Sequence, residues 1–429
     1  MARLTALFVM LVVLAAPVLA AGQARQPQTP KAEWGQYFPD DYRQSRDRIR
    51  DDCKRLNGVC ASLQVESATD RDLTIDTAFF SKDAATRLLV VQSGIHGSEA
   101  EAGAAVQRLL MNRYLPALQA SGIDVLIIHA LNPWGFVHHR RTDEWNVNLN
   151  RNFSLSGDIF KTPSDYYARY RDIFEPAGTI GSAFRGRISV ELAFARAFVT
   201  SGFDSEPINM AFASGQYESK DGMNYGGDRA AQQTGLLRRI LEPLVTDAKY
   251  SKIFFLDYHT GLGDDGVLAV IKGVSTSKPL MREFACAIGV DESPPAGQPA
   301  RTGPTGGIVI KSGSDEGFFP TVGDVIDFVP ELAPKDKPDS ILAVTMEYGT
   351  KGGGMVAQIA TAAEMILENQ KYHHRCTNAA ACDSIDKQFR ALFNPTDDVW
   401  RAAVIAESEQ VFDGIATRWR DPVCGAPGA

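Results

Sequence analysis

The feature that most constrains the fold of this chain is a set of short, nearly continuous apolar runs rich in leucine, isoleucine and valine. A strand buried on one face alternates apolar and polar residues, whereas continuous runs are typical of strands covered on both faces. The runs are Arg87–Ser93, Asp124–Ala130, Lys252–Tyr258, Gly266–Ile271 and Ile341–Met346. They predict a central sheet that has helices on each side.

Segments with a helical pattern lie between and after these runs. From Ser98 to Leu118, apolar residues recur every three or four positions, which places them on one stripe of a helix. Two more helices are predicted, from Leu236 to about Lys249 and from Gly354 to Tyr372. Strands that alternate with helices indicate an α/β sandwich.

The first twenty residues have the pattern of a signal peptide. Arg3 precedes an apolar run that ends in small residues, and cleavage is expected after Ala20, with Ala21 and Ala24 as other options. The alternative is a membrane anchor that stays attached. The run is shorter than the ~20 apolar residues that a spanning helix needs, and it contains Pro17. We therefore expect an exported protein, periplasmic or secreted, with no membrane segment after cleavage.

Composition divides the rest of the chain into three parts. Residues 21–34 contain several Gln, Pro and Ala residues and are predicted to be a flexible lead-in. The predicted strands and helices place one large α/β domain at residues 35–375, with a Pro- and Gly-rich loop from Asp291 to Thr305. Residues 376–429 are predicted to be a small helical extension.

Charge and cysteine content exclude several classes of protein. A formal net charge of -8 argues against a general nucleic-acid binder. Export to an oxidising compartment predicts at least one disulfide among the 6 cysteines, although their pairing stays open. The sequence contains no Cys-x-x-Cys, so a thiolate zinc site has little support.

Three polar clusters follow predicted strands, where ligands bind in open α/β sheets. His96 and Glu99 lie three residues apart at a strand-to-helix turn, where an imidazole and a carboxylate could form half of a zinc site. His259, at the end of another strand, could supply a third ligand, and Asp257 beside it could help to orient that ring. Glu347, at a third strand end, could act as a general base. His129, by contrast, lies inside an apolar run and is interpreted as a core histidine.

A segment dense in arginine and asparagine runs from Arg140 to Phe153. It could be a solvated, Asn-rich turn. The functional interpretation is a set of donors for an oxyanion and for a substrate carboxylate.

Taken together, these residues resemble the zinc carboxypeptidase superfamily. The resemblance rests on His96-x-x-Glu99, Asn150-Arg151, His259 and Glu347, in that order along the chain. Gly-Ile-His-Gly-Ser-Glu and Asn-Leu-Asn-Arg-Asn-Phe are closer to the branch of succinylglutamate desuccinylase and aspartoacylase. Segments similar to residues 129–136 and 215–227 occur in a bacterial group of uncharacterised proteins, which is closer still.

The resemblance implies a mixed, mostly parallel central sheet flanked by helices, with one Zn²⁺ ion bound by His96, Glu99 and His259. Glu347 would deprotonate the water that attacks the substrate and would then protonate the leaving nitrogen. Arg141, or less favourably Arg140, would stabilise the oxyanion.

The resemblance also implies that Asn150 and Arg151 would hold a substrate carboxylate. Arg140 is a further candidate for binding substrate. The tyrosine that binds substrate in carboxypeptidases has no single counterpart here. Its candidates are Tyr217, Tyr225 and Tyr348.

The function predicted from these residues is that of an exported zinc hydrolase that cleaves an amide bond. It would act as a metallocarboxypeptidase or as an N-acyl amino acid deacylase, on a peptide or an N-acyl amino acid. The alternatives are an amidase of cell-wall peptides and a non-catalytic binding protein on the same fold.

Overall fold

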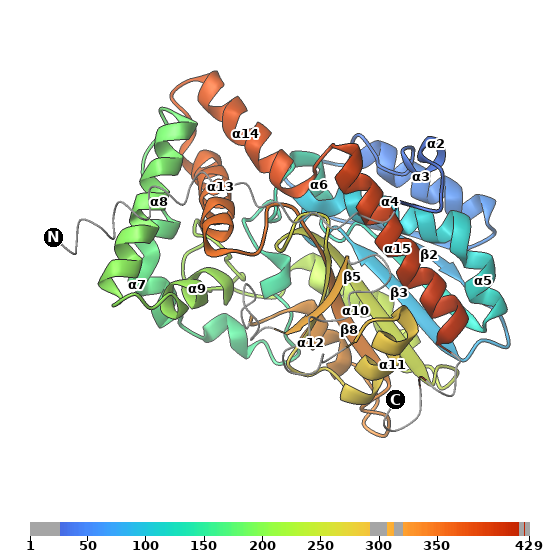
Figure 1. Ribbon diagram of the computed structural model, residues 1–429. Coiled ribbons are helices and arrows are strands. Elements are labelled where there is room, and N and C mark those ends of the chain that lie inside the picture. The colour runs from blue at the N-terminus through green and yellow to red at the C-terminus, as the bar shows by residue number, and fades with distance from the viewer. Residues whose placement is uncertain (1–25, 292–306, 313–320, 420–423, 425–429) are drawn as a thin grey trace.

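A computed structural model describes residues 26–291, 307–312, 321–419 and 424 of the chain. It contains one sheet of eight strands in the order β1-β2-β4-β3-β5-β8-β6-β7 (Figure 1). The strands are β1 Val59–Gln64, β2 Thr74–Phe80, β3 Arg87–Ser93, β4 Ile123–His129, β5 Lys252–Gly261, β6 Leu268–Lys272, β7 Ile308–Ser312 and β8 Ile341–Gly349.

The centre of the sheet is parallel and its margins are mixed. β4, β3, β5 and β8 run in the same direction, whereas β1, β2 and β6 pair antiparallel with a neighbour. The α/β class with a mixed, mostly parallel sheet is thus confirmed. All the runs that predicted strands form β3, β4, β5, β6 and β8. β1 gave no such signal because it is an edge strand and most of its residues are exposed.

The two faces of the sheet are both buried, as the apolar runs predicted. Leu89 and Val91 of β3 point into one core, and Leu88 and Val90 point into the other. The first core is covered by α2 Lys31–Trp34, α3 Tyr42–Arg55, α4 Ala100–Leu109, α5 Leu115–Ala120, α11 Lys278–Ile288 and α15 Asp398–Arg418. The second is covered by α6 Pro133–His138, α10 Gln232–Val245 and α12 Val325–Glu331.

A third apolar cluster lies among helices alone, at one end of the molecule in Figure 1. We call this group the helical lobe. It consists of α7 Asp165–Phe174, α8 Ala183–Thr200, α9 Glu206–Ala213, α13 Met355–His374 and α14 Ala379–Phe393. The predicted helix 354–372 is α13. α7, α8 and α9 were not predicted, and α8 and α9 form part of the wall of the cavity beside the site.

The predicted helix from Ser98 to Leu118 is interrupted. A 3₁₀ turn at Gly97–Glu99 precedes α4, and a π-helical turn at Leu110–Tyr114 separates α4 from α5. Pro116 lies in the first turn of α5, and its missing N–H prevents a regular helix from continuing through that point.

Both ends of the described chain pack against the rest of the fold. Part of the predicted flexible lead-in packs onto the fold: Trp34 is buried, and Glu409 accepts hydrogen bonds from the backbone of Gln28 and Thr29. The predicted extension is helical, yet α15 contributes to the first core, where Trp419 stacks on Phe254 of β5. Position 375 therefore does not separate two packing units. Most residues of α15 are buried, including the polar residues Glu407, Ser408 and Glu409.

The cysteines form the pairs Cys53–Cys60, Cys286–Cys424 and Cys376–Cys382. The expectation of at least one disulfide is met. Among the residues that the structure describes, we find no helix with the length and apolar character that a membrane crossing requires. The predicted signal peptide, residues 1–20, and most of the loop from Asp291 to Thr305 lie outside the described residues.

Candidate metal centre

The predicted ligands meet at the carboxyl edge of the parallel strands. His96 and Glu99 follow β3 and lie on the turn that begins α4, and His259 lies near the end of β5. Glu347 lies in β8, directly beside His259 in the register of the two strands. All of these side chains are buried. The sequence clusters thus converge as the strand-end argument predicted.

Close backbone packing holds the His96 turn in place. Gly94 has a φ of +68°, a left-handed conformation that glycine adopts without strain. A Cβ on Gly97 would lie only 1.9 Å from the carbonyl carbon of Gly135 in α6. The glycines on either side of His96 therefore fix the turn against α6 and aim the imidazole at the sheet edge.

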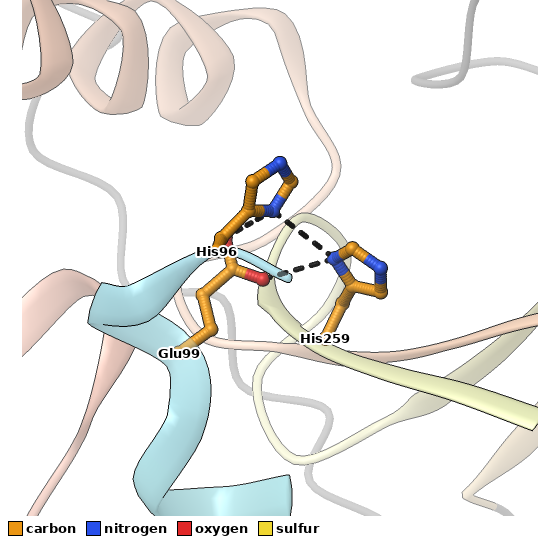
Figure 2. A group of neighbouring side chains, drawn as sticks. All are labelled: His96, Glu99 and His259. Atoms are coloured by element: carbon orange, nitrogen blue, oxygen red, sulfur yellow. Dashed lines mark hydrogen bonds and ion pairs between the residues drawn. The ribbon is translucent and has the colours of Figure 1, made fainter. Parts of the chain in front are cut away.

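The three ligand side chains point at one another, as Figure 2 shows. The Nδ1 atoms of His96 and His259 lie 3.2 Å apart. His96 Nδ1 is 3.0 Å from Glu99 Oε1, and His259 Nδ1 is 3.0 Å from Glu99 Oε2. Two ligands at about 2.1 Å from a tetrahedral zinc ion lie about 3.4 Å apart, so these separations suit a shared cation.

The outer nitrogen of each imidazole has its own hydrogen-bond acceptor. His96 Nε2 donates to Asn148 Oδ1 at 3.0 Å, and His259 Nε2 donates to Asp257 Oδ2 at 2.7 Å. Gln92 Nε2 in turn donates to Asp257 Oδ1 at 2.9 Å. These bonds fix both rings in the tautomer that turns the Nδ1 lone pair inward, which is how metal-binding histidines are oriented.

Electrostatics at the centre also favour a cation. Burial, with a contribution from Arg141, lowers the pKa of His96 to about 3, so this ring is neutral. Burial opposes the charged form of His259, but Asp257 and Glu99 outweigh it and raise the pKa of that ring. The charged form of His259 carries a second proton, on Nδ1 toward Glu99, and metal binding would displace that proton and free the lone pair.

Glu347 has the environment of a carboxyl group that exchanges protons near neutral pH. Burial, followed by repulsion from Glu99, raises its pKa to about 7. Its Oε1 accepts a hydrogen bond of 2.8 Å from the backbone N–H of Leu262, which fixes the orientation of the carboxyl group.

The two neighbouring arginines have different surroundings. Arg141 lines the main cavity, with Nε 3.3 Å from Glu99 Oε1 and Nη1 donating to Asn224 Oδ1 at 3.2 Å. Arg140 points elsewhere, with its Nη1 3.3 Å from Glu368 Oε1 and its guanidinium over the ring of Tyr372. Of the two candidates for the oxyanion donor, only Arg141 lies beside the ligands.

The side chains of Asn150 and Arg151 also lie in different surroundings. Arg151 lines the main cavity, where its Nε donates to the carbonyl of Ala213 and its nearest carboxylate oxygen, on Asp324, is 3.9 Å away. Burial lowers its pKa to about 10, which leaves it charged at neutral pH. The Oδ1 of Asn150 accepts from the backbone of Val325, so this side chain is engaged with the start of α12.

The candidate tyrosines lie in three different places. The hydroxyl of Tyr217 donates to the Arg151 carbonyl at 2.8 Å. Tyr225 is a buried member of the second core. Tyr348 faces the first core, where its hydroxyl pairs with Ser408. None of the three lines the main cavity of the described residues.

Several residues at the centre were not singled out from the sequence. Asn148 and Asn224 link His96 to Arg141, because Asn148 Nδ2 donates to Asn224 Oδ1 at 2.8 Å. Thr260 contributes a backbone N–H 3.2 Å from Glu99 Oε2. Asn148 and Asn224 both belong to segments on which the family resemblance rests. That membership is the sequence signal from which their place at the site could have been predicted.

Comparison with solved structures gives matches of low sequence identity. Carboxypeptidase A from Helicoverpa armigera matches at 12% identity over 83% of this chain and 74% of its own, with a TM-score of 0.41. Bovine thrombin-activatable fibrinolysis inhibitor matches at 12% over 79% and 99%, with a TM-score of 0.43. A metallo-carboxypeptidase from Burkholderia cenocepacia matches at 11% over 76% and 67%, with a TM-score of 0.38.

No curated protein matches the chain. A family model does match, over residues 38–407, which include every ligand of the candidate centre and cross the predicted boundary at 375. This agrees with the resemblance to a group of uncharacterised proteins. The chain belongs to the family described as protein of unknown function (DUF2817).

Proposed function

We propose that this protein is an exported, zinc-dependent hydrolase that cleaves an amide bond. The observation that carries the proposal is the arrangement of His96, Glu99 and His259, whose donor atoms lie within 4.8 Å of one another. Two imidazoles and one carboxylate suit zinc, and a set of three leaves a position open for chemistry.

When bound, the metal would polarise a water molecule and the scissile carbonyl. Glu347 would accept a proton from the attacking water while the new C–O bond forms. It would then give that proton to the leaving nitrogen as the C–N bond breaks, so that the products are a carboxylic acid and an amine. A carboxyl group whose pKa lies near neutrality is suited to both transfers.

Two cations would position the substrate. Arg141, beside Glu99, would stabilise negative charge that develops on the carbonyl oxygen. Arg151 would bind a substrate carboxylate, because it is a buried cation whose nearest protein carboxylate is 3.9 Å away. Arg140 pairs with Glu368, and Asn150 accepts a hydrogen bond from the backbone of Val325. Because these contacts occupy both side chains, we assign them to holding the site in shape rather than to binding substrate.

The non-catalytic alternative has less support. A protein that had lost activity on this fold would be expected to lack the base or a ligand, whereas here Glu347 and the three ligands are all present and buried. A cell-wall peptide amidase would use the same chemistry, and a substrate panel that includes muropeptides distinguishes it from the other two activities.

The test combines metal analysis with a substrate panel. The purified protein should contain about one zinc ion per chain after reconstitution, and it should hydrolyse at least one of short peptides, N-acyl amino acids or muropeptides. Absence of stoichiometric metal after reconstitution would refute the centre. Metal binding without hydrolysis of any class would favour the binding protein.

A further inference from the structure

The candidate metal centre opens into a cavity of about 300 Å³. The walls away from the centre come from the helical lobe. They are formed mainly by apolar side chains of α8, α9 and α13, among them Phe194, Phe198, Ile208, Phe212, Ile359 and Met365. A cavity of this size is at the lower end of those that hold small organic ligands.

Charge is absent from the helical walls of this cavity. The charged side chains in its lining are Glu99, Arg141, Arg151 and Glu347, and none of them belongs to α8, α9 or α13. The helical walls add a few neutral polar groups, such as Ser205 and Asn209. A charged substituent that entered this region would lose its hydration without gaining a counter-charge.

The helical end of the cavity continues into an exposed apolar surface. Met355, at the start of α13, lines the cavity and is 50% exposed. On α8, Ala195 lines the cavity and lies one turn from Leu192 and Val199, which are 64% and 55% exposed. A long apolar group could therefore extend from the metal centre to the surface while remaining in contact with apolar side chains.

We infer that the substrate carries a long alkyl acyl chain on the nitrogen of an amino acid or peptide. This inference rests on the proposed function and narrows its substrate. The amide lies at the metal centre, the carboxylate of the amino acid lies at Arg151, and the alkyl chain lies along α8, α9 and α13. The reaction releases a fatty acid and an amine.

The first test measures binding to the metal-free protein, where no turnover occurs. Calorimetry would compare N-acetylglycine with N-hexanoylglycine, N-octanoylglycine and N-dodecanoylglycine. Affinity should rise about fourfold for each added methylene until the chain fills the cavity, the fold-change that corresponds to ~0.8 kcal/mol per buried CH₂. Equal affinity for all chain lengths would overturn the inference, and this result requires no variant.

A matched pair of variants on α8 tests the location. Ala195→Phe places a ring in the cavity, whereas Ala193→Phe places the same ring on a half-buried residue outside the lining. Ala195→Phe should weaken N-dodecanoylglycine binding at least tenfold, with a smaller effect on N-acetylglycine. Ala193→Phe should keep the wild-type dependence on chain length. Equal loss in both variants, or loss in neither, would count against this cavity as the acyl site.

Hydrolysis by the zinc-loaded protein separates the two proposals. Binding that depends on chain length, without hydrolysis of any N-acyl amino acid, short peptide or muropeptide, would leave the acyl site standing and refute the proposed function. Equal binding and hydrolysis of the acetyl and dodecanoyl substrates would support the function and refute the acyl site.

Discussion

His259 of β5 and Glu347 of β8 are direct neighbours in the register of two parallel strands. Both residues lie on the sheet face that carries the second core, at the end of an alternating pattern that begins at Ile253 and Ile341. A shift of one residue in either strand would turn one of these side chains to the opposite face. The pairing of a metal ligand with the proposed base is therefore set by backbone hydrogen bonds rather than by a flexible loop.

The first prediction concerns the proton transfers assigned to Glu347. Glu347→Gln keeps the size of the side chain and its bond to the Leu262 N–H but removes the exchangeable carboxyl proton. We expect kcat to fall by about 10²- to 10⁴-fold with zinc content unchanged. Glu242→Gln, an exposed carboxylate on α10, is the control and should retain activity. Unchanged turnover in Glu347→Gln would refute the assignment.

The second prediction concerns Asp257, which accepts from His259 Nε2. Asp257→Asn should lower zinc affinity by about 10- to 100-fold, because the imidazole loses the carboxylate that orients it and raises its basicity. Competition against a chromophoric chelator measures this directly, and circular dichroism checks that the fold is intact. Wild-type affinity would show that the ring is held by its packing alone.

The third prediction concerns removal of the metal. A ligand that binds only the folded protein stabilises it by about 4 kcal/mol when present at a thousand times its Kd. Thermal unfolding of the zinc-loaded protein should therefore shift to lower temperature after chelation and return when zinc is restored. His96→Ala removes a ligand and should abolish this shift. An identical shift in His96→Ala would place the stabilising metal elsewhere.

The fourth prediction concerns His129, whose Nδ1 donates to Gln107 Oε1 at 2.9 Å and whose Nε2 lies 3.1 Å from Ser45 Oγ. It is the core histidine that its apolar surroundings predicted. Burial lowers its pKa from 6.5 to about 4. The stability that this neutral ring contributes is present above pH 6.5 and is lost as the pH falls through 4. The loss totals about 3 kcal/mol.

Urea unfolding at pH 7.5, 6, 5 and 4 would measure that loss. The stability difference between the wild type and His129→Gln should shrink as the pH falls from 6.5 to 4. His374→Gln, a change on an exposed ring, should follow the wild type at each pH. A difference that stays constant across this range would show that His129 does not carry the acid sensitivity.

The sheet and the ligand set could be predicted because both have short-range signatures. Strands buried on both faces require continuous apolar runs, and open parallel sheets bind ligands at their carboxyl edge. His96, Glu99, His259 and Glu347 each lie at such an edge. Their meeting point follows from the topology, which does not depend on the details of side-chain packing.

The cavity could not be predicted in the same way. Its walls depend on how α8, α9 and α13 pack on one another, and the apolar residues of α8 include exposed ones such as Phe184 and Leu192. That mixture weakens the helical periodicity from which buried faces are recognised. Arg140 and Arg141 are adjacent in sequence, and only tertiary contacts separate the one that pairs with Glu368 from the one that faces the ligands.

The burial of α15 has a consequence for how the chain reaches its final structure. This helix begins at Asp398, completes the first core, and holds Gln28 and Thr29 through Glu409. The earliest and latest described segments must therefore meet before the core is closed. A polypeptide still being synthesised lacks α15, so the first core can close only after the ribosome has released the chain through this helix. A shortened gene product that stops near residue 375 should accordingly be a substrate for proteases rather than a smaller folded protein.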